Sequence, residues 1–401
     1  MAEEPIDLCI VGGGPAGMMA GLLFARAGVK TLVLEKHADF LRDFRGDTVH
    51  PSTLGLIDEL GLLDTFLERP HDKVDDIEAV VAGTRYRIAD FSHLPGRGKF
   101  VAMMPQWEFL DFVADEAERY PTFSLRKETE AEAAIEEAGR VVGVRTTAGE
   151  DIRARLVIAA DGRGSKLRAG LPLQDLGAPI DVLWFRVPKQ RTPTNDTQGY
   201  ISGGEMIVAI DRGDYFQCAR VIEKGSAERV LARGIEAFRA EVAAVVPEVR
   251  GGIGELASLD EVKLLTVTLD RLTRWHRPGL LAIGDAAHAM SPVGGVGINL
   301  AIQDAVAAAY ILAGPMAHGD DPDPLLAKVQ KRRMFPVKMI QAMQRTVHRT
   351  VLRAALAGTV QKAPWPVRLL GRTPLLQRIP ARVLGLGVRR EHIRSPDAGL
   401  R

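Results

Sequence analysis

A glycine-rich turn near the start of the chain constrains the fold more than any other feature. Its glycines have the spacing Gly12-x-Gly14-x-x-Gly17. An apolar run at 6–11 precedes the turn, a segment rich in Ala, Leu and Met follows it at 18–27, and a second apolar run occupies 31–34. This order predicts a buried strand, a helix and a second, parallel strand, which is how a dinucleotide-binding α/β fold begins.

The residue types in this turn suit a bound dinucleotide. Gly12 permits the tight turn, Gly14 lets the backbone approach a pyrophosphate, and Gly17 lets the helix pack closely on the strand, while the helix N-terminus offers N–H groups to the phosphates. Glu35 ends the second strand, where its carboxylate can bind ribose hydroxyls and disfavours the 2′-phosphate of NADP. The alternative is an ordinary turn beside a surface glutamate. We assign cofactor binding here to Gly12, Gly14, Pro15, Ala16, Gly17, Glu35 and Lys36.

A second glycine-rich constellation lies late in the chain. The run Gly284-Asp285-Ala286-Ala287-His288 follows an apolar strand, and Pro292-x-x-Gly295-x-Gly297-x-Asn299 then opens a helix. An acid at a strand end can hold a sugar-like hydroxyl, and glycines beside a helix N-terminus let a planar ring lie against the backbone. The partial positive charge of that helix end would stabilise an anionic ring.

A third motif, Asp161-Gly162 followed by Arg163 to Arg168, lies between these two. In their order and spacing, the three motifs resemble those of the FAD-dependent (class A) flavoprotein monooxygenases of the para-hydroxybenzoate hydroxylase type, over roughly residues 5–350. The first resembles that family's fingerprint for the adenosine of FAD, and the second resembles the motif whose aspartate binds the ribitol.

The resemblance gives FAD-binding roles to further residues. Arg45 matches an arginine that contacts FAD or follows its ring, Gln106 matches a glutamine that touches the middle of the cofactor, and the backbone of Ala131 would meet the adenine. Asp285 would bind the ribitol, and Asp161 would lie beside FAD in a motif also linked to the nicotinamide cofactor. The residues along the isoalloxazine ring would be Pro292, Gly295, Gly297 and Asn299.

The resemblance also implies an enzyme and its reaction. NADH or NADPH would reduce bound FAD by hydride transfer, O2 would add at the flavin C4a, and the hydroperoxide would hydroxylate an electron-rich, aromatic or quinone-like small molecule. The protein would position the reactants, exclude water and stabilise the anionic flavin through the helix near Gly295. Movement of the flavin would be the gating step.

The substrate is expected between the flavin and antiparallel strands within 181–222. Tyr215, Gln217 and Ala219 share one face of a strand, which offers a hydroxyl and an amide beside a small residue. Arg220 lies on the other face, where it could supply a cation for a phenolate or carboxylate. Either face of the strand could contact the substrate, and all of these side chains could instead only pack within the sheet. The substrate-side catalytic candidates are Tyr215, Gln217 and Arg220.

The predicted fold class is α/β, with an FAD-binding Rossmann-like domain, an inserted antiparallel-sheet substrate domain and a helical C-terminal segment. The discontinuous FAD-binding domain comprises residues 1–72, 100–172 and 276–350. The substrate-binding domain comprises residues 73–99 and 173–275, with a helix expected over 226–246. Residues 351–401 form the basic helical C-terminal segment.

Composition excludes several classes of protein. The chain has 52 Lys and Arg against 51 Asp and Glu, a net charge of +1 that argues against nucleic-acid binding. Cys9 and Cys218 cannot form a disulfide framework or a four-cysteine zinc site, and no cluster has metal-ligand spacing, so His288 is expected to be structural. The short acidic N-terminus is not a signal peptide and no apolar run reaches 18 residues, so we expect a cytoplasmic protein.

The C-terminal part of the chain is strongly basic. Residues 325–401 contain 17 Lys or Arg but only two acids, Glu391 and Asp397. Apolar residues at a spacing of four predict a helical stripe through Met339, Met343, Val347 and Val351. The stripe could pack on the acidic FAD domain, form a homodimer contact, or attach weakly to an anionic membrane.

Three other functions compete with hydroxylation. Flavin-dependent halogenases share the scaffold but carry a Trp-x-Trp-x-Ile-Pro segment, which is absent here. A flavin reductase or dehydrogenase acting on a prenyl or quinone-like substrate would not incorporate oxygen into its product. A non-enzymatic flavin-binding protein would hold FAD that NAD(P)H cannot reduce.

Overall fold

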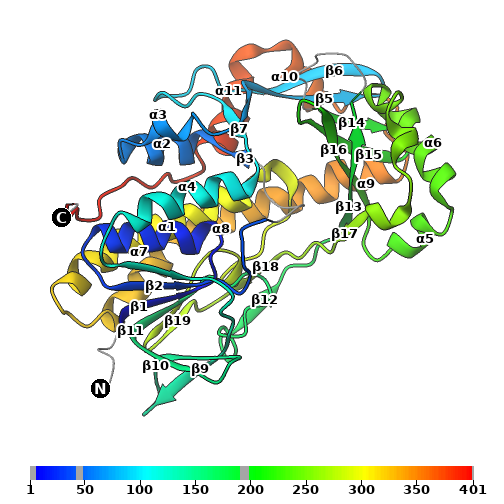
Figure 1. Ribbon diagram of the computed structural model, residues 1–401. Coiled ribbons are helices and arrows are strands. Elements are labelled where there is room, and N and C mark those ends of the chain that lie inside the picture. The colour runs from blue at the N-terminus through cyan, green and yellow to red at the C-terminus, as the bar shows by residue number, and fades with distance from the viewer. Residues whose placement is uncertain (1–5, 42–47, 190–197, 400–401) are drawn as a thin grey trace.

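The computed structural model describes residues 6–41, 48–189 and 198–399 of the 401-residue chain. These residues build two large sheets that are connected by long helices and bordered by the C-terminal helices (Figure 1). Arg45 lies outside the described residues.

The first large sheet has eight strands and carries the glycine turn at the carboxyl end of its central strand. That strand, β1 (Ile6–Val11), is parallel to its neighbours on both sides. Its last four residues are buried, because helices and strands cover both faces of the sheet. The strand order is β19-β20-β11-β1-β2-β8, and β10 and β9 continue from β11 as antiparallel strands. The remaining strands are β2 (Thr31–Leu34), β8 (Phe123–Arg126), β9 (Ala131–Glu137), β10 (Arg140–Thr146), β11 (Asp151–Ala159), β19 (His276–Arg277) and β20 (Leu280–Ala282).

Three helices pack over this sheet (Figure 1). α1 (Pro15–Arg26) lies against both α4 (Gln106–Glu118) and α7 (Gly297–Ala317). The stretch Val293–Ala317 is long and apolar enough to cross a membrane, but 78% of its apolar window is buried, as in a core helix. The short helices α2 (Pro51–Glu59) and α3 (Leu63–Phe66) follow the first strands.

The second large sheet has seven strands in the order β17-β13-β16-β15-β14-β5-β6. Its strands are β5 (Asp76–Val81), β6 (Thr84–Asp90), β13 (Ile180–Pro188), β14 (Gln198–Ser202), β15 (Glu205–Asp211), β16 (Tyr215–Glu223) and β17 (Lys263–Leu265). All pairs are antiparallel except β5 with β14, which joins the hairpin from the early part of the chain to the later strands. This is the α/β fold with an antiparallel sheet that the sequence predicts.

Two short helices cover the outer face of the second sheet. They are α5 (Ala227–Leu231) and α6 (Ile235–Val245). The sequence predicts one helix over 226–246, which is wrong because Gly234 adopts a φ of +86° and ends the first helix. Two small sheets complete the strands: β3 (Thr48–Val49), β7 (Val101–Met103) and β4 (Asp72–Val74), and β12 (Leu173–Asp175) with β18 (Asp270–Leu272).

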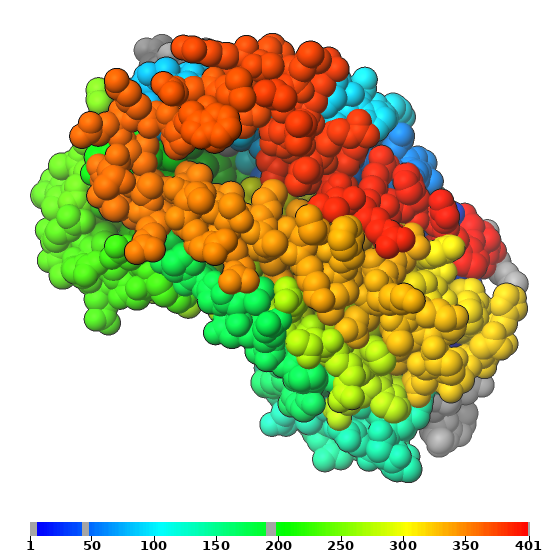
Figure 2. Space-filling model, turned by 180° about the vertical axis from the view of Figure 1, so that it is seen from behind, coloured from blue at the N-terminus to red at the C-terminus, as the bar shows by residue number. Residues whose placement is uncertain are grey.

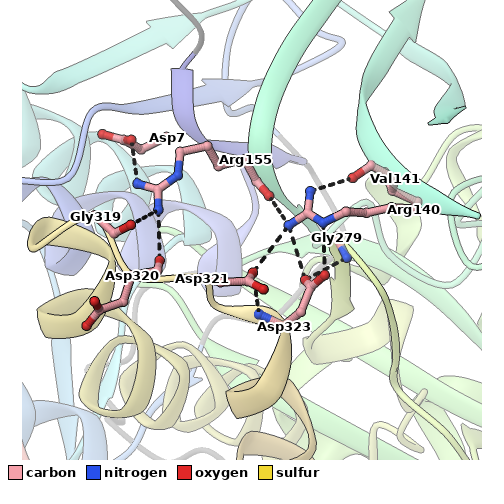
Figure 3. A network of polar contacts seen from close by, with 9 residues as sticks. All are labelled: Asp7, Arg140, Val141, Arg155, Gly279, Gly319, Asp320, Asp321 and Asp323. Atoms are coloured by element: carbon pink, nitrogen blue, oxygen red, sulfur yellow. Dashed lines mark hydrogen bonds and ion pairs between the residues drawn. The ribbon is translucent and has the colours of Figure 1, made fainter. Parts of the chain in front are cut away.

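Two arginines fasten the end of the first sheet that lies opposite the glycine turn (Figure 3). Arg155 binds the Asp7 carboxylate at 3.1 Å and donates to two backbone carbonyls at 319–320, each at 2.8 Å. Arg140 binds Asp323 at 2.9 Å, at the start of α8 (Asp323–Val347). These contacts fix the connection from α7 to α8 and hence the direction in which α8 leaves the first sheet.

The C-terminal part runs from the first sheet to the second and back. α8 continues through a π-helical turn (His348–Leu352) into α9 (Arg353–Leu356), and α10 (Trp365–Arg372) and α11 (Pro374–Gly385) pack on β6. The tail then returns to α1, where the Ala398 backbone N–H donates to the Arg26 carbonyl at 2.8 Å. Seen from behind, this segment runs across the upper part of the molecule from one side to the other (Figure 2).

The buried face of α8 differs from the predicted stripe. Met339 is 45% exposed, and the other three members of the stripe are only half-buried. The buried face is rotated by about one residue and is partly polar; it includes Arg333, Val337, Ile340, Gln344 and His348. The reason is that α8 packs on backbone groups at 289–293, which need hydrogen-bond partners.

Candidate functional site

The glycine turn forms a cradle at the N-terminus of α1. Gly12 has a φ of +109°, and a Cβ there would lie 2.4 Å from the Ala160 carbonyl oxygen. A Cβ on Gly17 would lie 1.8 Å from the Gly12 carbonyl oxygen, so only glycine allows the helix to start this close to the strand. A Cβ on Gly14 would meet nothing within 4 Å. The turn is therefore closed toward the protein and open on the side where a pyrophosphate would approach.

Glu35 lies against this turn at the end of β2. Its Oε2 accepts the Gly13 backbone N–H at 3.0 Å, and its Oε1 accepts the His37 N–H at 3.0 Å. The side chain is buried, whereas the neighbouring Lys36 is exposed. Ala131 begins β9 and is buried. The glycine turn and Glu35 therefore lie side by side at one edge of the sheet.

The second and third motifs are joined by an ion pair. Arg163 Nε donates to Asp285 Oδ2 at 2.9 Å, and both side chains are partly exposed. Arg168 donates to the backbone carbonyls of Arg163 and Ala286, at 2.5 and 3.4 Å. Asp161 Oδ2 accepts the Lys166 backbone N–H at 3.2 Å. The two acidic motif residues therefore lie on adjoining loops.

Two buried oxygens at this end of the sheet have no hydrogen-bond partner among the described residues. They are Gln106 Oε1, in the first turn of α4, and Asp161 Oδ1. Asp161 adjoins the glycine turn, since a Cβ on Gly12 would lie 2.8 Å from its backbone nitrogen. Burial raises the pKa of the Asp161 carboxyl, against the hydrogen bonds from Ser165 and Lys166. Unpaired buried acceptors of this kind are typical of a ligand site.

Asn299 holds the second glycine turn in place. Its Oδ1 accepts the His50 backbone N–H at 2.9 Å and the Thr53 hydroxyl at 2.7 Å. Its Nδ2 donates to the carbonyls of Thr48 and Gly295, at 3.2 and 3.3 Å. The amide is thus engaged with protein groups, so we assign its side chain to the turn rather than to a ring lying on it. Pro292, Gly295 and Gly297 form that turn, with Gly295 at a φ of +62°.

Two polar residues of α8 and its π-helical turn support the second turn from behind. Gln344 accepts the Ser291 N–H at 3.2 Å and donates to the carbonyls of Ser291 and Val293, at 2.8 and 3.0 Å. His348 Nε2 lies 2.9 Å from the Ser291 hydroxyl oxygen. The sequence analysis missed both. The sequence pattern that could have identified them is a glutamine and a histidine four residues apart, because this spacing places both side chains on one face of a helix.

A fully buried ionic cluster lies beneath the Gly-Asp motif. Asp304 on α7 accepts hydrogen bonds from His288 Nε2 at 2.5 Å, Arg333 Nε at 2.8 Å and the Gly284 N–H at 3.1 Å. Arg333 also pairs with Glu391 of the C-terminal tail at 3.4 Å. Burial alone would raise the pKa of Asp304, but His288 and Arg333 hold it below its usual value. His288 is therefore a buried partner within this cluster.

Arg220 faces away from the second glycine turn. It is buried against α6, where its guanidinium binds Glu205 at 2.6 Å and Glu241 at 2.7 Å. Its neighbours on that face, Phe216 and Cys218, pack with Phe238 of α6. The suggestion that Arg220 supplies a cation to a substrate beside the turn is therefore wrong, because two carboxylates already neutralise it on the opposite face of the sheet.

The face with Tyr215, Gln217 and Ala219 is the one turned toward the second glycine turn. Ala219 belongs to an apolar cluster that also contains Val293 of that turn. Gln217 is buried, and its Nε2 donates to the Phe185 carbonyl at 3.3 Å. Its amide therefore forms a hydrogen bond within the sheet. Tyr215 is half-buried, with the Arg186 guanidinium 5.1 Å from the centre of its ring.

A residue that the sequence analysis missed lies on the same face. Trp184 pairs with Ala219 across β13 and β16, and it packs in the clusters that contain Val293 and Leu384. Its indole nitrogen is buried and has no hydrogen-bond partner among the described residues. The face of the second sheet that is turned toward the second glycine turn is therefore an apolar wall, and the Trp184 indole N–H is a hydrogen-bond donor on it without a partner among the described residues. A lone tryptophan in an alternating strand gives no sequence signal for this.

Comparison with known proteins places this site in a family. Residues 5–343 match the family described as FAD binding domain. The chain is 31% identical to 6-methylpretetramide 4-monooxygenase of Streptomyces rimosus, over 94% of this chain and 91% of that protein. It is 25% identical to 3-demethoxyubiquinol 3-hydroxylase of Escherichia coli, over 83% and 87%. The structure of OxyS anhydrotetracycline hydroxylase from Streptomyces rimosus superposes with a TM-score of 0.75 at 23% identity, covering 99% of this chain and 78% of that one.

The matched range includes all three motifs, and the superposition with the solved structure covers 99% of this chain. The chain therefore belongs to the FAD binding domain family and is an FAD-dependent monooxygenase of the para-hydroxybenzoate hydroxylase type.

Proposed function

We propose that the protein uses NADH or NADPH and O2 to hydroxylate a small, electron-rich aromatic or quinone-like molecule. The observation that carries the proposal is the apolar wall on the second sheet, where Ala219 and Trp184 pack in one cluster with Val293 of the second glycine turn. A planar apolar molecule on this wall would lie beside the turn along which the flavin ring is expected. The demethoxyubiquinol hydroxylated by one relative supports a quinone-like substrate.

The residues present fit FAD. The open face at Gly14 and the N-terminus of α1 suit the pyrophosphate, and Glu35 suits the adenosine ribose. The unpaired oxygens of Gln106 and Asp161 would accept hydrogen bonds from cofactor hydroxyl or amide groups. Bound FAD would supply hydride acceptance and oxygen activation, the chemistry that no protein side chain provides.

This chain's own residues would orient and stabilise the reacting groups. Val296, which precedes α7, makes no side-chain capping bond, so the first N–H groups of α7 can face an anionic ring beside Gly297. Asn299, Gln344 and Ser291 hold the turn in one conformation from the rear. A rigid donor array of this kind stabilises developing charge without reorganising during the reaction.

Trp184 is our candidate for contacting the substrate. Its N–H would donate to a carbonyl or phenolic oxygen, which would pair a donor that the protein leaves unpaired. Trp184→Phe keeps the ring and removes the donor. We expect KM to rise about fivefold with little change in kcat, because one neutral hydrogen bond contributes about 1 kcal/mol.

The matched control is Trp365→Phe, the same chemical change at a surface-exposed tryptophan. In assays without lipid it should leave both constants at wild-type values. Steady-state kinetics with the best substrate make the comparison, and a Trp184→Phe enzyme with an unchanged KM would remove Trp184 from the substrate site.

A screen of phenols, quinone precursors and polyketides for stimulated NAD(P)H oxidation tests the proposed function as a whole. The proposal requires that at least one such compound accelerates oxidation and is recovered with an added hydroxyl group. Accelerated oxidation with a reduced product and no added oxygen would favour the flavin reductase or dehydrogenase instead. Parallel assays with NADH and NADPH identify the reductant.

A further inference from the structure

The C-terminal helices α10 and α11 expose large apolar side chains to solvent. The exposed fractions are 70% for Trp365, 45% for Leu369, 67% for Leu375 and 62% for Ile379. Four of the eleven large exposed apolar side chains among the described residues thus lie on these two short helices. A concentration of this kind marks an interaction surface.

The exposure follows from how the helices are fixed to the protein. They use small residues for the contact: a Cβ on Gly371 would lie 2.8 Å from the Tyr86 ring, a Cβ on Gly385 would lie 2.7 Å from Leu94, and Ala381 is fully buried. Gln377 Nε2 donates to the Leu370 carbonyl at 2.9 Å and joins the two helices. Small residues thus share the inward contact with Val367, Val383 and Leu384. Four large apolar residues face outward, where an ordinary surface helix carries polar side chains.

The charges on this surface have one sign. No Asp or Glu occurs between residues 324 and 390, a stretch that contains 15 Lys or Arg. The arginines that lie between the exposed apolar residues are Arg368, Arg372, Arg378 and Arg382, and all four are exposed. In the described part of the chain, no acidic side chain forms an ion pair with them.

We propose that this surface, defined by Trp365, Leu369, Leu375, Ile379 and the four interleaved arginines, docks the protein on an anionic phospholipid bilayer. The apolar side chains would enter the boundary between headgroups and acyl chains, and the arginines would bind lipid phosphates at the same depth. A second copy of the chain fits less well, because a two-fold contact would bring one basic face against another. The exposed aliphatic residues have no role on a nucleic acid, which the net charge of +1 also disfavours.

Docking would bring the proposed substrate wall close to the lipid. Leu384, at the end of α11, packs in the same cluster as Trp184, and its Cδ2 would lie 3.1 Å from a Cβ on Gly294. In the space-filling view, a hollow separates the orange end of α8 from the red α11 (Figure 2). A lipophilic substrate could then pass directly from the bilayer, a consequence that rests on the proposed function.

Cosedimentation of the full-length, FAD-loaded protein with vesicles tests the docking. The vesicles contain phosphatidylcholine alone or an equal mixture of phosphatidylcholine and phosphatidylglycerol, at low and high salt. We expect binding to the mixed vesicles that is at least about tenfold tighter than to phosphatidylcholine and that falls with salt. The triple variant Trp365→Ser, Leu375→Ser, Ile379→Ser should lose about tenfold or more in affinity while keeping its FAD absorbance and circular dichroism.

The control is Leu173→Ser with Leu264→Ser, which removes two other exposed apolar side chains, at 48% and 49% exposure, from other surfaces. Its vesicle binding should equal that of the wild type. No binding to the mixed vesicles at low salt would overturn the proposal, as would equal binding by the triple variant. A dimer that the triple variant dissociates, without vesicle binding, would assign the surface to a second copy instead. The assay contains no substrate, so failure of the proposed hydroxylation would leave its result intact.

Discussion

Replacing Arg333 with methionine is expected to lower the free energy of unfolding by about 3–5 kcal/mol, the usual effect of removing one partner from a buried ion pair. Arg333 is fully buried and pairs with Asp304 at 2.8 Å and with Glu391 at 3.4 Å. Its removal would leave the buried Asp304 carboxylate against His288 and the buried Glu391 carboxylate against the partly exposed Arg332. Equilibrium urea unfolding followed by tryptophan fluorescence measures the change, and Trp275, whose ring centroid lies 5.1 Å from that of His288, reports on this region.

Arg332→Met is the matched control for this variant. Arg332 binds the same Glu391 at 2.7 Å, but its side chain is partly exposed, so water can replace part of the interaction. We expect it to cost clearly less than Arg333→Met, and adding Asp304→Asn to Arg333→Met should restore part of the loss. An Arg333→Met protein within about 1 kcal/mol of the wild type would contradict a structural role for the cluster.

Asp285→Ala is expected to weaken FAD binding by at least roughly ten- to a hundredfold while the fold is kept. The strand before Asp285 buries its apolar residues in either case, whereas the carboxylate is partly exposed at the strand end beside Arg163. Loss of charge-assisted hydrogen bonds to the ribitol would cost roughly 1.5–3 kcal/mol, and the unpaired Arg163 would add to the loss. Flavin absorbance of the purified protein and titration of the apoprotein with FAD measure the effect.

Asp285→Asn separates the effect of the charge of this side chain on FAD binding from the effect of its shape. It can still accept a hydrogen bond from a hydroxyl, so its FAD affinity should lie between those of the wild type and Asp285→Ala. Circular dichroism should be unchanged in both variants, and the urea midpoints of their apoproteins should equal that of the wild-type apoprotein, because bound FAD itself stabilises the folded state. If Asp285→Ala retained FAD and wild-type turnover, the Gly-Asp motif would have another purpose.

The glycine turn and the position of Glu35 beside it could be predicted because local geometry dictates these residues. Gly12 has a φ of +109°, a Cβ on Gly17 would meet the Gly12 carbonyl oxygen only five residues earlier, and Glu35 is fixed by its place at the end of a strand. Such constraints act over a few residues and therefore leave a readable pattern. The fold class follows from the same elements, since a parallel sheet needs helical crossovers.

The substrate side could not be predicted because its residues are set by partners distant in sequence. Alternation shows that Ala219 and Arg220 point to opposite faces, but only the position of α6, with Glu241, decides which face is outward. The prediction of which face of α8 is buried failed for a related reason. Met339 of the predicted stripe is exposed and its other members lie at the border of the contact face, because the backbone at 289–293 needs the polar Gln344 at the centre of that face.

The most direct test of the central claim is the fate of dioxygen. Purified protein is supplied with NADH or NADPH, the best substrate from the screen, and dioxygen labelled with oxygen-18, and the product is analysed by mass spectrometry. An FAD-dependent monooxygenase should place one labelled atom in each product molecule and the other in water, with one reduced nicotinamide consumed per product in a coupled reaction. Product that carries oxygen from water, or product formed equally well without dioxygen, would contradict it.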